Sequence, residues 1–158
     1  MASITITTPV GPFTILARDE TVLAAGFTDE VDALLARVPP GVDADLDRPV
    51  KAVRAYFDGD LTAIDGMAVE QRGGPFLESA RAALRAVPAG APVSYTGLAA
   101  AAGRPAAVRA AAQACARNAA ALFVPCHRVV RTDGTLGGYR WGIEIKRWLL
   151  AHERETGS

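Results

Sequence analysis

Residues 122–130 read LFVPCHRVV, and this stretch decides how the C-terminal half of the chain is organised. Two apolar runs bracket a cysteine, a histidine and an arginine in consecutive positions. Pro125 has no amide hydrogen and a fixed φ, which predicts a stiff, non-helical backbone at Cys126. Cysteine is nucleophilic as the thiolate, and a neighbouring imidazole or guanidinium favours that form. The pattern indicates a reactive site rather than a packed loop.

The composition of the whole chain limits the kind of protein that can carry this site. Its 158 residues are 50% apolar and 22% charged, which is ordinary for a soluble globular protein. Two cysteines and two histidines are too few for a disulfide framework or an ordinary structural zinc site, so we expect no metal and no cofactor. The sequence shows no secretory signal and no run of transmembrane length. We expect a monomeric cytoplasmic protein, nucleoid-associated if prokaryotic, that does not bind membranes.

The net charge of zero hides a division between the two halves of the chain. Residues 1–71 carry 5 basic and 12 acidic side chains, whereas residues 72–158 carry 12 basic and 5 acidic ones, so the halves have net charges of −7 and +7. Eleven of the twelve basic residues in the second half are arginine, which suits contacts to phosphates and base edges. The asymmetry favours DNA or RNA as the partner of that half. Two solvated surfaces that dock on each other are the alternative.

The N-terminal half has the pattern of a small antiparallel sheet with helices. Turn residues separate three segments in which β-branched and apolar residues recur, at 3–7, 13–18 and 22–27. Helical spacing follows over 29–37 and 48–57. The carboxylates of this half are scattered, without the pairing that acid–base catalysis needs, so we interpret it as a scaffold.

The composition changes at residues 71–75, and we place the domain boundary there. The N-terminal scaffold domain covers residues 1–72, and a second domain covers residues 73–158. Pro75 can open a helix at its first turn, and that helix ends near Ala86. The predicted fold class is α+β: a small antiparallel sheet domain with helices, followed by a mainly α-helical domain.

Two short helices in the second domain have the spacing of a helix-turn-helix. Ser94 is a good N-cap for a helix that runs to about Ala102. Residues 103–105 read GRP and make a tight turn, and a second helix covers residues 106–117. Asn118 closes this helix, because asparagine tolerates left-handed geometry.

The second of these helices has one apolar face and one face suited to nucleic acid. At about 100° per residue, one side carries Val108, Ala111, Ala112 and Cys115, so Cys115 is interpreted as an inert core residue. The opposite side carries two arginines and a glutamine among methyl-sized neighbours: Ala106, Arg109, Ala110, Gln113 and Arg117. Such a surface can approach a nucleic-acid groove closely, and a solvated helix face is the alternative.

The end of the chain adds a loop and a last helix to the reactive stretch. Residues 137–142 read GGYRWG, a Gly-bracketed loop whose backbone can approach a planar ligand. In the helix over 143–154, Glu153 lies where it could reach inward as a carboxylate partner. A Cys–His hydrolase is one interpretation, although adjacent residues on an extended backbone point to opposite sides. Cys126 and His127 would then communicate through a water molecule.

The sequence PCHRVV at residues 125–130 resembles the active-site signature of the O6-alkylguanine-DNA alkyltransferases, or methylated-DNA–protein-cysteine methyltransferases. The resemblance covers the chain from about Pro75 onward, and Thr8–Pro12 looks like the opening hairpin of that family. Further matches occur at the family's spacing: Ser94-Tyr95, Arg109, Asn118, Gly138-Tyr139, Lys146 and Leu149–Glu153.

The resemblance implies a chemical role for five residues. Cys126 takes the alkyl group from O6 of guanine, and by extension from O4 of thymine, in one displacement. His127 removes the thiol proton through water, and Glu153 orients His127. Tyr95 donates to the purine as it leaves, and Asn118 organises the turn beside the site. Because a thioether is not easily hydrolysed, the protein would be consumed after one turnover.

The resemblance also implies how DNA is bound. The partner is double-stranded DNA containing O6-alkylguanine, entered from the minor groove with the damaged base flipped out. Arg109 fills the vacated space in the stack, and Tyr95 also contacts DNA. The flipped base meets main-chain groups of Cys126, Val129 and the Tyr139-Arg140 loop, so Val129, Tyr139 and Arg140 form the base pocket.

Two other functions stay open at this point. One is a non-enzymatic helix-turn-helix protein that reads alkylated DNA and leaves Cys126 unused. The other is a small cysteine hydrolase in which the arginines are incidental. For Arg128 we expect structural pairing under the site.

Overall fold

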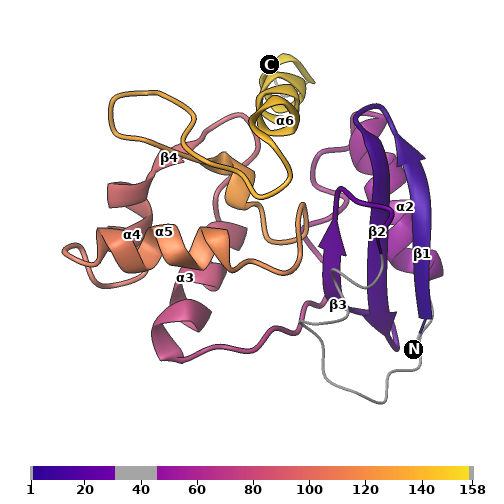
Figure 1. Cartoon of the computed structure of the whole chain (residues 1–158), viewed down its shortest axis with the longest axis horizontal. Helices are drawn as coiled ribbons and strands as arrows, with labels where there is room; N and C mark the ends of the chain where they lie inside the picture. The colour runs from indigo at the N-terminus through magenta and orange to yellow at the C-terminus, as the bar shows by residue number, and fades with distance from the viewer. Residues whose placement is uncertain (1, 31–45, 157–158) are drawn as a thin grey trace. The chain divides into compact units, whose positions relative to one another are not determined.

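The computed structural model describes residues 2–30 and 46–156, and the chain forms two compact units (Figure 1). The first unit comprises Met1–Gln71 and Ala119–Phe123, and the second comprises Arg72–Asn118 and Val124–Ser158. The helix expected over 29–37 lies outside the described residues, apart from its first two positions. No helix in the described ranges is long and apolar enough to cross a membrane.

The first unit is built on a three-stranded antiparallel sheet in the order β1-β2-β3, which confirms the expected meander. Its strands are β1 (Ala2–Thr8), β2 (Gly11–Arg18) and β3 (Thr21–Gly26). The middle strand is buried along most of its length, with Phe13, Ile15 and Leu16 fully enclosed. Helix α2 (Asp47–Phe57) buries Val50, Val53 and Tyr56 on one side.

A five-residue segment from the C-terminal half of the sequence completes the first unit. The carbonyl oxygen of Ala119 accepts from the amide of Ala25 at 2.8 Å, and the amide of Ala121 donates to the carbonyl of Ala25 at 3.0 Å. Leu122 is fully buried in a left-handed conformation with φ of 68°. The division of the sequence at residue 72 leaves this segment in the second part. Its side chains are all apolar, and such a run shows no preference that would assign it to either unit.

The second unit is mainly helical, as expected, and the whole chain is α+β. It contains α3 (Pro75–Arg85), α4 (Tyr95–Ala101), α5 (Val108–Ala116) and α6 (Ile143–Thr156). Two short parallel strands, β4 (Val93–Ser94) and β5 (Val129–Val130), pair directly. This pairing holds the start of α4 beside the stretch that contains Cys126.

Helices α4 and α5 form the expected helix-turn-helix, with one change at the start of α5. Ser94 caps α4, and its Oγ accepts from the amide of Gly97 at 2.9 Å. Helix α5 begins at Val108, so Ala106 is not on its outer face as expected but lies exposed in the preceding turn. The turn continues to this point because the amide of Ala107 bonds to the carbonyl of Arg104 at 2.9 Å.

The cap at Ser94 yields a stability prediction. Ser94→Ala should lower the free energy of unfolding by about 1 kcal/mol, because the Gly97 amide loses its acceptor. Ser94→Thr keeps an acceptor and should lose less than half of that. Urea unfolding followed by far-ultraviolet circular dichroism measures both, and equal losses would show that the cap is not the source.

Candidate active site

Cys126 lies in a single turn of 3₁₀-helix, η1 (Cys126–Arg128), that directly precedes β5. The amide of Arg128 donates to the carbonyl of Pro125 at 3.0 Å and closes this turn. The expectation of a non-helical backbone at Cys126 is therefore wrong. Pro125 stands just before the turn, where its missing amide hydrogen leaves no bond unmade. Since the backbone turns here, Cys126 and His127 do not alternate as they would on a strand.

Asn118 joins the end of α5 to the reactive cysteine. Its Nδ2 donates to the carbonyl of Val124 at 2.7 Å and to Sγ of Cys126 at 3.3 Å. We expected Asn118 to close the helix in left-handed geometry, but its φ is not positive; Leu122 adopts that conformation instead. The side chain of Asn118, rather than its backbone, organises the turn.

Different features around the Cys126 thiol shift its pKa in opposite directions. Burial raises its pKa, whereas the hydrogen bond from Asn118 and the positive charge of Lys146 lower it. Lys146 is fully buried, and its Nζ donates to the carbonyls of Val129 at 2.7 Å and Gly138 at 3.1 Å. A buried ammonium with two carbonyl partners supplies a fixed positive charge beside the thiol.

Sequence reasoning assigned no role to Lys146, although a signal was present. Lys146, Leu149 and Glu153 are spaced i, i+3 and i+7, and they are the fully buried residues of α6. The buried face of α6 therefore carries one cation and one anion, which hydrophobicity alone does not indicate.

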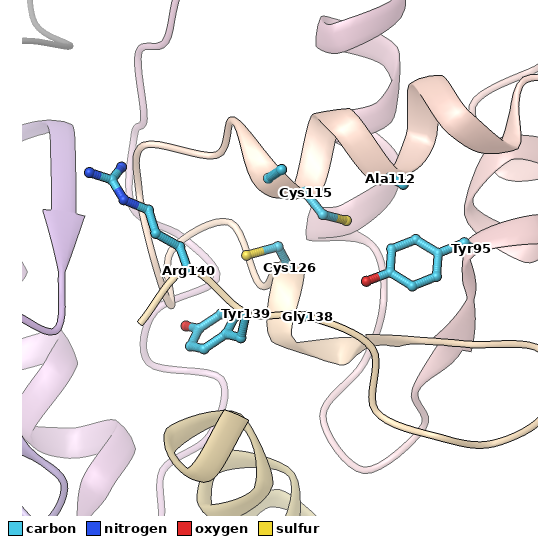
Figure 2. A pocket seen from close by; sticks show the side chains of 8 residues that line it. Tyr95, Ala112, Cys115, Cys126, Gly138, Tyr139 and Arg140 are labelled. Carbon is cyan, nitrogen blue, oxygen red and sulfur yellow. The ribbon is translucent and has the colours of Figure 1, made fainter. Parts of the chain in front are cut away.

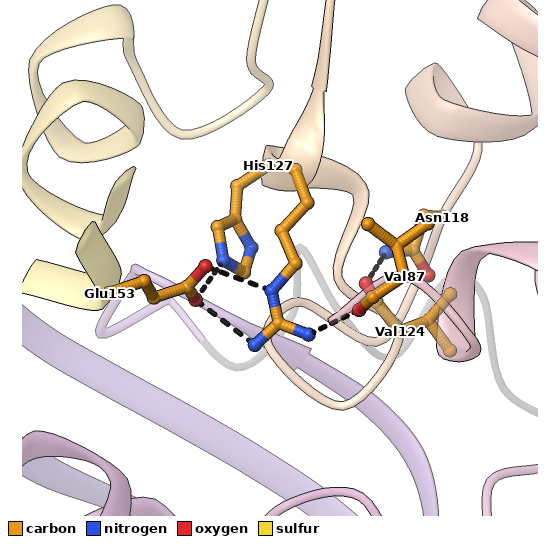
Figure 3. A network of polar contacts seen from close by, with 6 residues as sticks. Val87, Asn118, Val124, His127 and Glu153 are labelled. Carbon is orange, nitrogen blue, oxygen red and sulfur yellow. Dashed lines mark hydrogen bonds and ion pairs between the residues drawn. The ribbon is translucent and has the colours of Figure 1, made fainter. Parts of the chain in front are cut away.

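His127, Arg128 and Glu153 form a buried polar network (Figure 3). Nε2 of His127 lies 2.6 Å from Oε2 of Glu153. Arg128 donates to both carboxylate oxygens of Glu153, from Nε to Oε1 at 2.9 Å and from Nη2 to Oε2 at 3.1 Å. Its Nη1 donates to the carbonyl of Val87 at 2.8 Å. Arg128 thus pairs structurally beneath the site, as expected.

This network determines which nitrogen of His127 carries the hydrogen. Burial alone would raise the pKa of Glu153, but His127 and Arg128 lower it to about 2, so the group is a carboxylate near neutral pH. Burial lowers the pKa of His127, so its ring is neutral there. A carboxylate can only accept, so Nε2 holds the hydrogen and donates to Glu153. Nδ1 then has a free lone pair, and it makes no hydrogen bond with the described residues.

The thiol of Cys126 opens into a pocket of about 410 Å³, here called the Cys126 pocket (Figure 2). Helices α4 and α5, the turn η1 and the loop after β5 contribute its lining: Tyr95, Ala112, Cys115, Ala116, Cys126, Gly138, Tyr139 and Arg140. Val129, an expected pocket residue, does not line it, and its carbonyl instead accepts from Lys146. Within the described residues, no group of three or more His, Cys, Asp or Glu side chains could hold a metal ion.

Cys115 is not the core residue that the helical wheel suggested. It is half-buried and lines the Cys126 pocket, while Ala111 and Ala114 are the fully buried residues of α5. The buried face of α5 is therefore rotated from the predicted one. Burial, with a smaller contribution from Cys126, raises the pKa of the Cys115 thiol to about 12, so it stays protonated near neutral pH.

Tyr95 stands between the Cys126 pocket and a neighbouring hollow that includes Arg109. This second pocket, of about 320 Å³, shares Tyr95, Ala112 and Gly138 with the first. Gly137 has φ of 70°, and a Cβ there would lie 3.0 Å from the hydroxyl of Tyr95. The close approach and the left-handed backbone both require glycine at this position.

The expected DNA-contacting residues fall into three groups. Arg109 and Gln113 are exposed on α5, as the wheel predicted, and Arg117 is exposed at the C-cap that ends the helix. Ala110 is on α5 but is partly buried. Ala106 precedes the helix. Of the exposed residues, Arg109 lines the second pocket together with Tyr95.

Removal of the Glu153 carboxylate should be strongly destabilising. Glu153→Gln should lower the free energy of unfolding at pH 7 by about 3–5 kcal/mol, because Arg128 keeps a buried charge without its counter-ion. Glu144→Gln, at an exposed position of the same helix, should change it by less than about 0.5 kcal/mol. As pH falls from about 4.5 to about 2, wild type should lose the advantage over Glu153→Gln, because the carboxyl takes up its proton more readily in the unfolded chain. Thermal unfolding across this range checks the trend, and a constant difference would contradict it.

Comparisons with known proteins identify the family. The model of the 6-O-methylguanine DNA methyltransferase DNA-binding domain matches residues 75–155. The methylated-DNA–protein-cysteine methyltransferase of Salmonella typhimurium is 36% identical over 165 residues, covering 94% of this chain and 92% of that protein. The bifunctional transcriptional activator/DNA repair enzyme Ada of Escherichia coli is 55% identical over 85 residues, which cover 54% of this chain but 24% of Ada. The structure of Mycobacterium tuberculosis OGT in complex with DNA has a TM-score of 0.84 at 31% identity, over 98% of this chain and 93% of that one. As its own motifs predicted, this chain belongs to the 6-O-methylguanine DNA methyltransferase family.

Proposed function

We propose that this protein repairs DNA by moving an alkyl group, typically methyl, from O6 of guanine to Sγ of Cys126, and that it also accepts the group from O4 of thymine. One observation carries the proposal. The Cys126 thiol lines an open pocket, while Asn118 donates to the sulfur and the neighbouring residue, His127, has an unpaired Nδ1 and a hydrogen bond to Glu153. A cysteine that only packed would need neither group.

The first step activates the thiol. The proton of Cys126 passes to a bridging water, and that water gives a proton to Nδ1 of His127. The resulting imidazolium is stabilised by the Glu153 carboxylate at 2.6 Å. Asn118 and Lys146 stabilise the thiolate, which offsets the cost of its burial. Arg128 holds Glu153 as an acceptor, and thereby holds His127 as a base rather than a donor toward the thiol.

The second step is the displacement itself. The thiolate attacks the alkyl carbon, the carbon–oxygen bond breaks, and its electron pair goes to the guanine. Tyr95 donates a proton to the departing base, and burial raises the pKa of this phenol so that it is still protonated near neutral pH. The thioether formed at Cys126 is not easily hydrolysed. Each molecule therefore reacts once, as a stoichiometric acceptor.

The basic half of the chain supports binding to duplex DNA. Helix α5 and its C-cap expose Arg109, Gln113 and Arg117, and the helix contains no acidic residue. Arg109 lines the second pocket together with Tyr95, so its side chain is suited to fill the space that the damaged base leaves in the stack when it flips out. The M. tuberculosis homologue, solved with DNA, supports the same partner for this chain.

A direct test follows the alkyl group. Duplex DNA with labelled O6-methylguanine should transfer its label to Cys126 in a one-to-one ratio, and Cys126→Ser should transfer none. Cys115→Ser, which removes the other thiol of the pocket, should retain full stoichiometry because that thiol stays protonated. Peptide mapping locates the label. Binding without transfer would favour a non-enzymatic reader of alkylated DNA, and repeated turnover would favour a hydrolytic enzyme.

The proposed stacking role of Arg109 can be distinguished from the effect of its positive charge. Arg109→Ala should slow repair of duplex DNA about tenfold or more but slow repair of single-stranded oligonucleotides much less, because only the duplex leaves a stacking gap. Arg147→Ala removes an equal charge from an exposed position on α6 and should affect both substrates little. Single-turnover rates measure the ratio. Equal losses on duplex and single strand would contradict the stacking role.

A further inference from the structure

Unpaired polar atoms gather beside the reactive thiol. In the described part of the chain, three buried side-chain nitrogen or oxygen atoms make no hydrogen bond: Arg81 Nε, His127 Nδ1 and Tyr139 Oη. Arg81 is elsewhere, on α3, and its guanidinium is held by the carbonyl of Arg72 at 2.7 Å. The other two belong to neighbouring rings, and their coincidence calls for a physical cause.

The two rings meet next to Cys126. The His127 and Tyr139 ring centroids are 6.5 Å apart, and the ring planes cross at 74°, an edge-to-face contact. Tyr139 lines the Cys126 pocket together with the thiol, while His127 follows Cys126 in η1. Burial, then the charges of Cys126 and Glu153, hold the pKa of the Tyr139 phenol well above its usual range. Its hydroxyl is therefore protonated near neutral pH and can donate a hydrogen bond.

A buried hydroxyl without a partner is costly, and so is a buried imidazole nitrogen. A phenylalanine would line the pocket equally well without that cost. The two atoms differ in a useful way, because Tyr139 Oη can donate and Nδ1 of neutral His127 can only accept. A water molecule both accepts and donates, so one water can satisfy the pair and still accept from a third group.

We propose that Tyr139 Oη and His127 Nδ1 together hold one ordered water molecule against the Cys126 thiol, and that Tyr139 positions this water for proton removal. This rests on the proposed function, which needs a bridging water but does not say what holds it. The thiol and Tyr139 donate to the water oxygen, and the water donates to Nδ1. The thiol proton moves to the water as a water proton moves to Nδ1. Tyr139 keeps its own proton, so it is a positioning residue.

The test is Tyr139→Phe, which removes one oxygen and leaves the ring. The reaction of Cys126 with iodoacetamide is followed from about pH 6 to about pH 10, on Cys115→Ser protein so that one pocket thiol remains. The apparent pKa of the reacting thiol should rise, and the rate near neutral pH should fall about fivefold to tenfold, the loss expected for one hydrogen bond. An unchanged pH profile would overturn the role of Tyr139.

A double-mutant cycle distinguishes positioning from packing. In a His127→Gln background the water has lost its base, so Tyr139→Phe should have little further effect on the thiol rate. Independent, additive losses would show that Tyr139 acts without His127 and would overturn the proposal. If Tyr139→Phe does not fold, a high-resolution crystal structure of the wild type decides. A water within hydrogen-bond distance of both atoms supports the proposal, and its absence overturns it.

The proposed function is tested separately by label transfer from methylated DNA. Wild-type protein that transfers no label would refute alkyl transfer but leave the iodoacetamide profile readable. If wild type transfers the label and Tyr139→Phe has the same pH profile as wild type in the iodoacetamide reaction, only the water site is refuted.

Discussion

Glu153 is fully buried and yet ionised, because Arg128 binds both of its oxygens and His127 donates to one of them. The pairing joins α6 to η1 and, through the carbonyl of Val87, to the segment after α3. It also fixes the hydrogen of His127 on Nε2 and turns Nδ1 toward a basic role. Structure and chemistry thus depend on one carboxylate, in a half of the chain that has 5 acidic residues against 12 basic ones.

The site balances burial against reactivity. A buried thiol resists ionisation, which limits its reaction with unrelated electrophiles. Asn118 and Lys146 oppose that resistance with a hydrogen bond and a positive charge, and both are themselves tied to main-chain carbonyls. Such fixed groups need no rearrangement as negative charge develops. Cys115 lies in the same pocket, and burial raises the pKa of its thiol to about 12 although the charge of Lys146 lowers it, so this thiol remains protonated near neutral pH.

Local patterns predicted most of the fold and singled out Cys126 as the candidate reactive residue. Alternation located the three strands, the cap at Ser94 located α4, and the PCHRVV signature located Cys126. Predictions of which face of a helix is buried were less accurate. A small error in where a helix begins, or in which face points inward, changes the predicted environment of every residue in that helix. Ala106 precedes α5 instead of lying on it, Cys115 lines the Cys126 pocket instead of the core, and Lys146 is buried although lysine is usually exposed.

By itself, the sequence determined the α+β class, the helix-turn-helix, the charge division and the family, since each is carried by short-range spacing or by a specific motif. Only the tertiary structure decided that residues 119–123 complete the first unit, that Arg128 and His127 share one carboxylate, and that the rings of His127 and Tyr139, each with an unpaired polar atom, lie in contact. These relations join residues far apart in the chain. Their energies depend on burial and distance, which no local pattern of residues encodes.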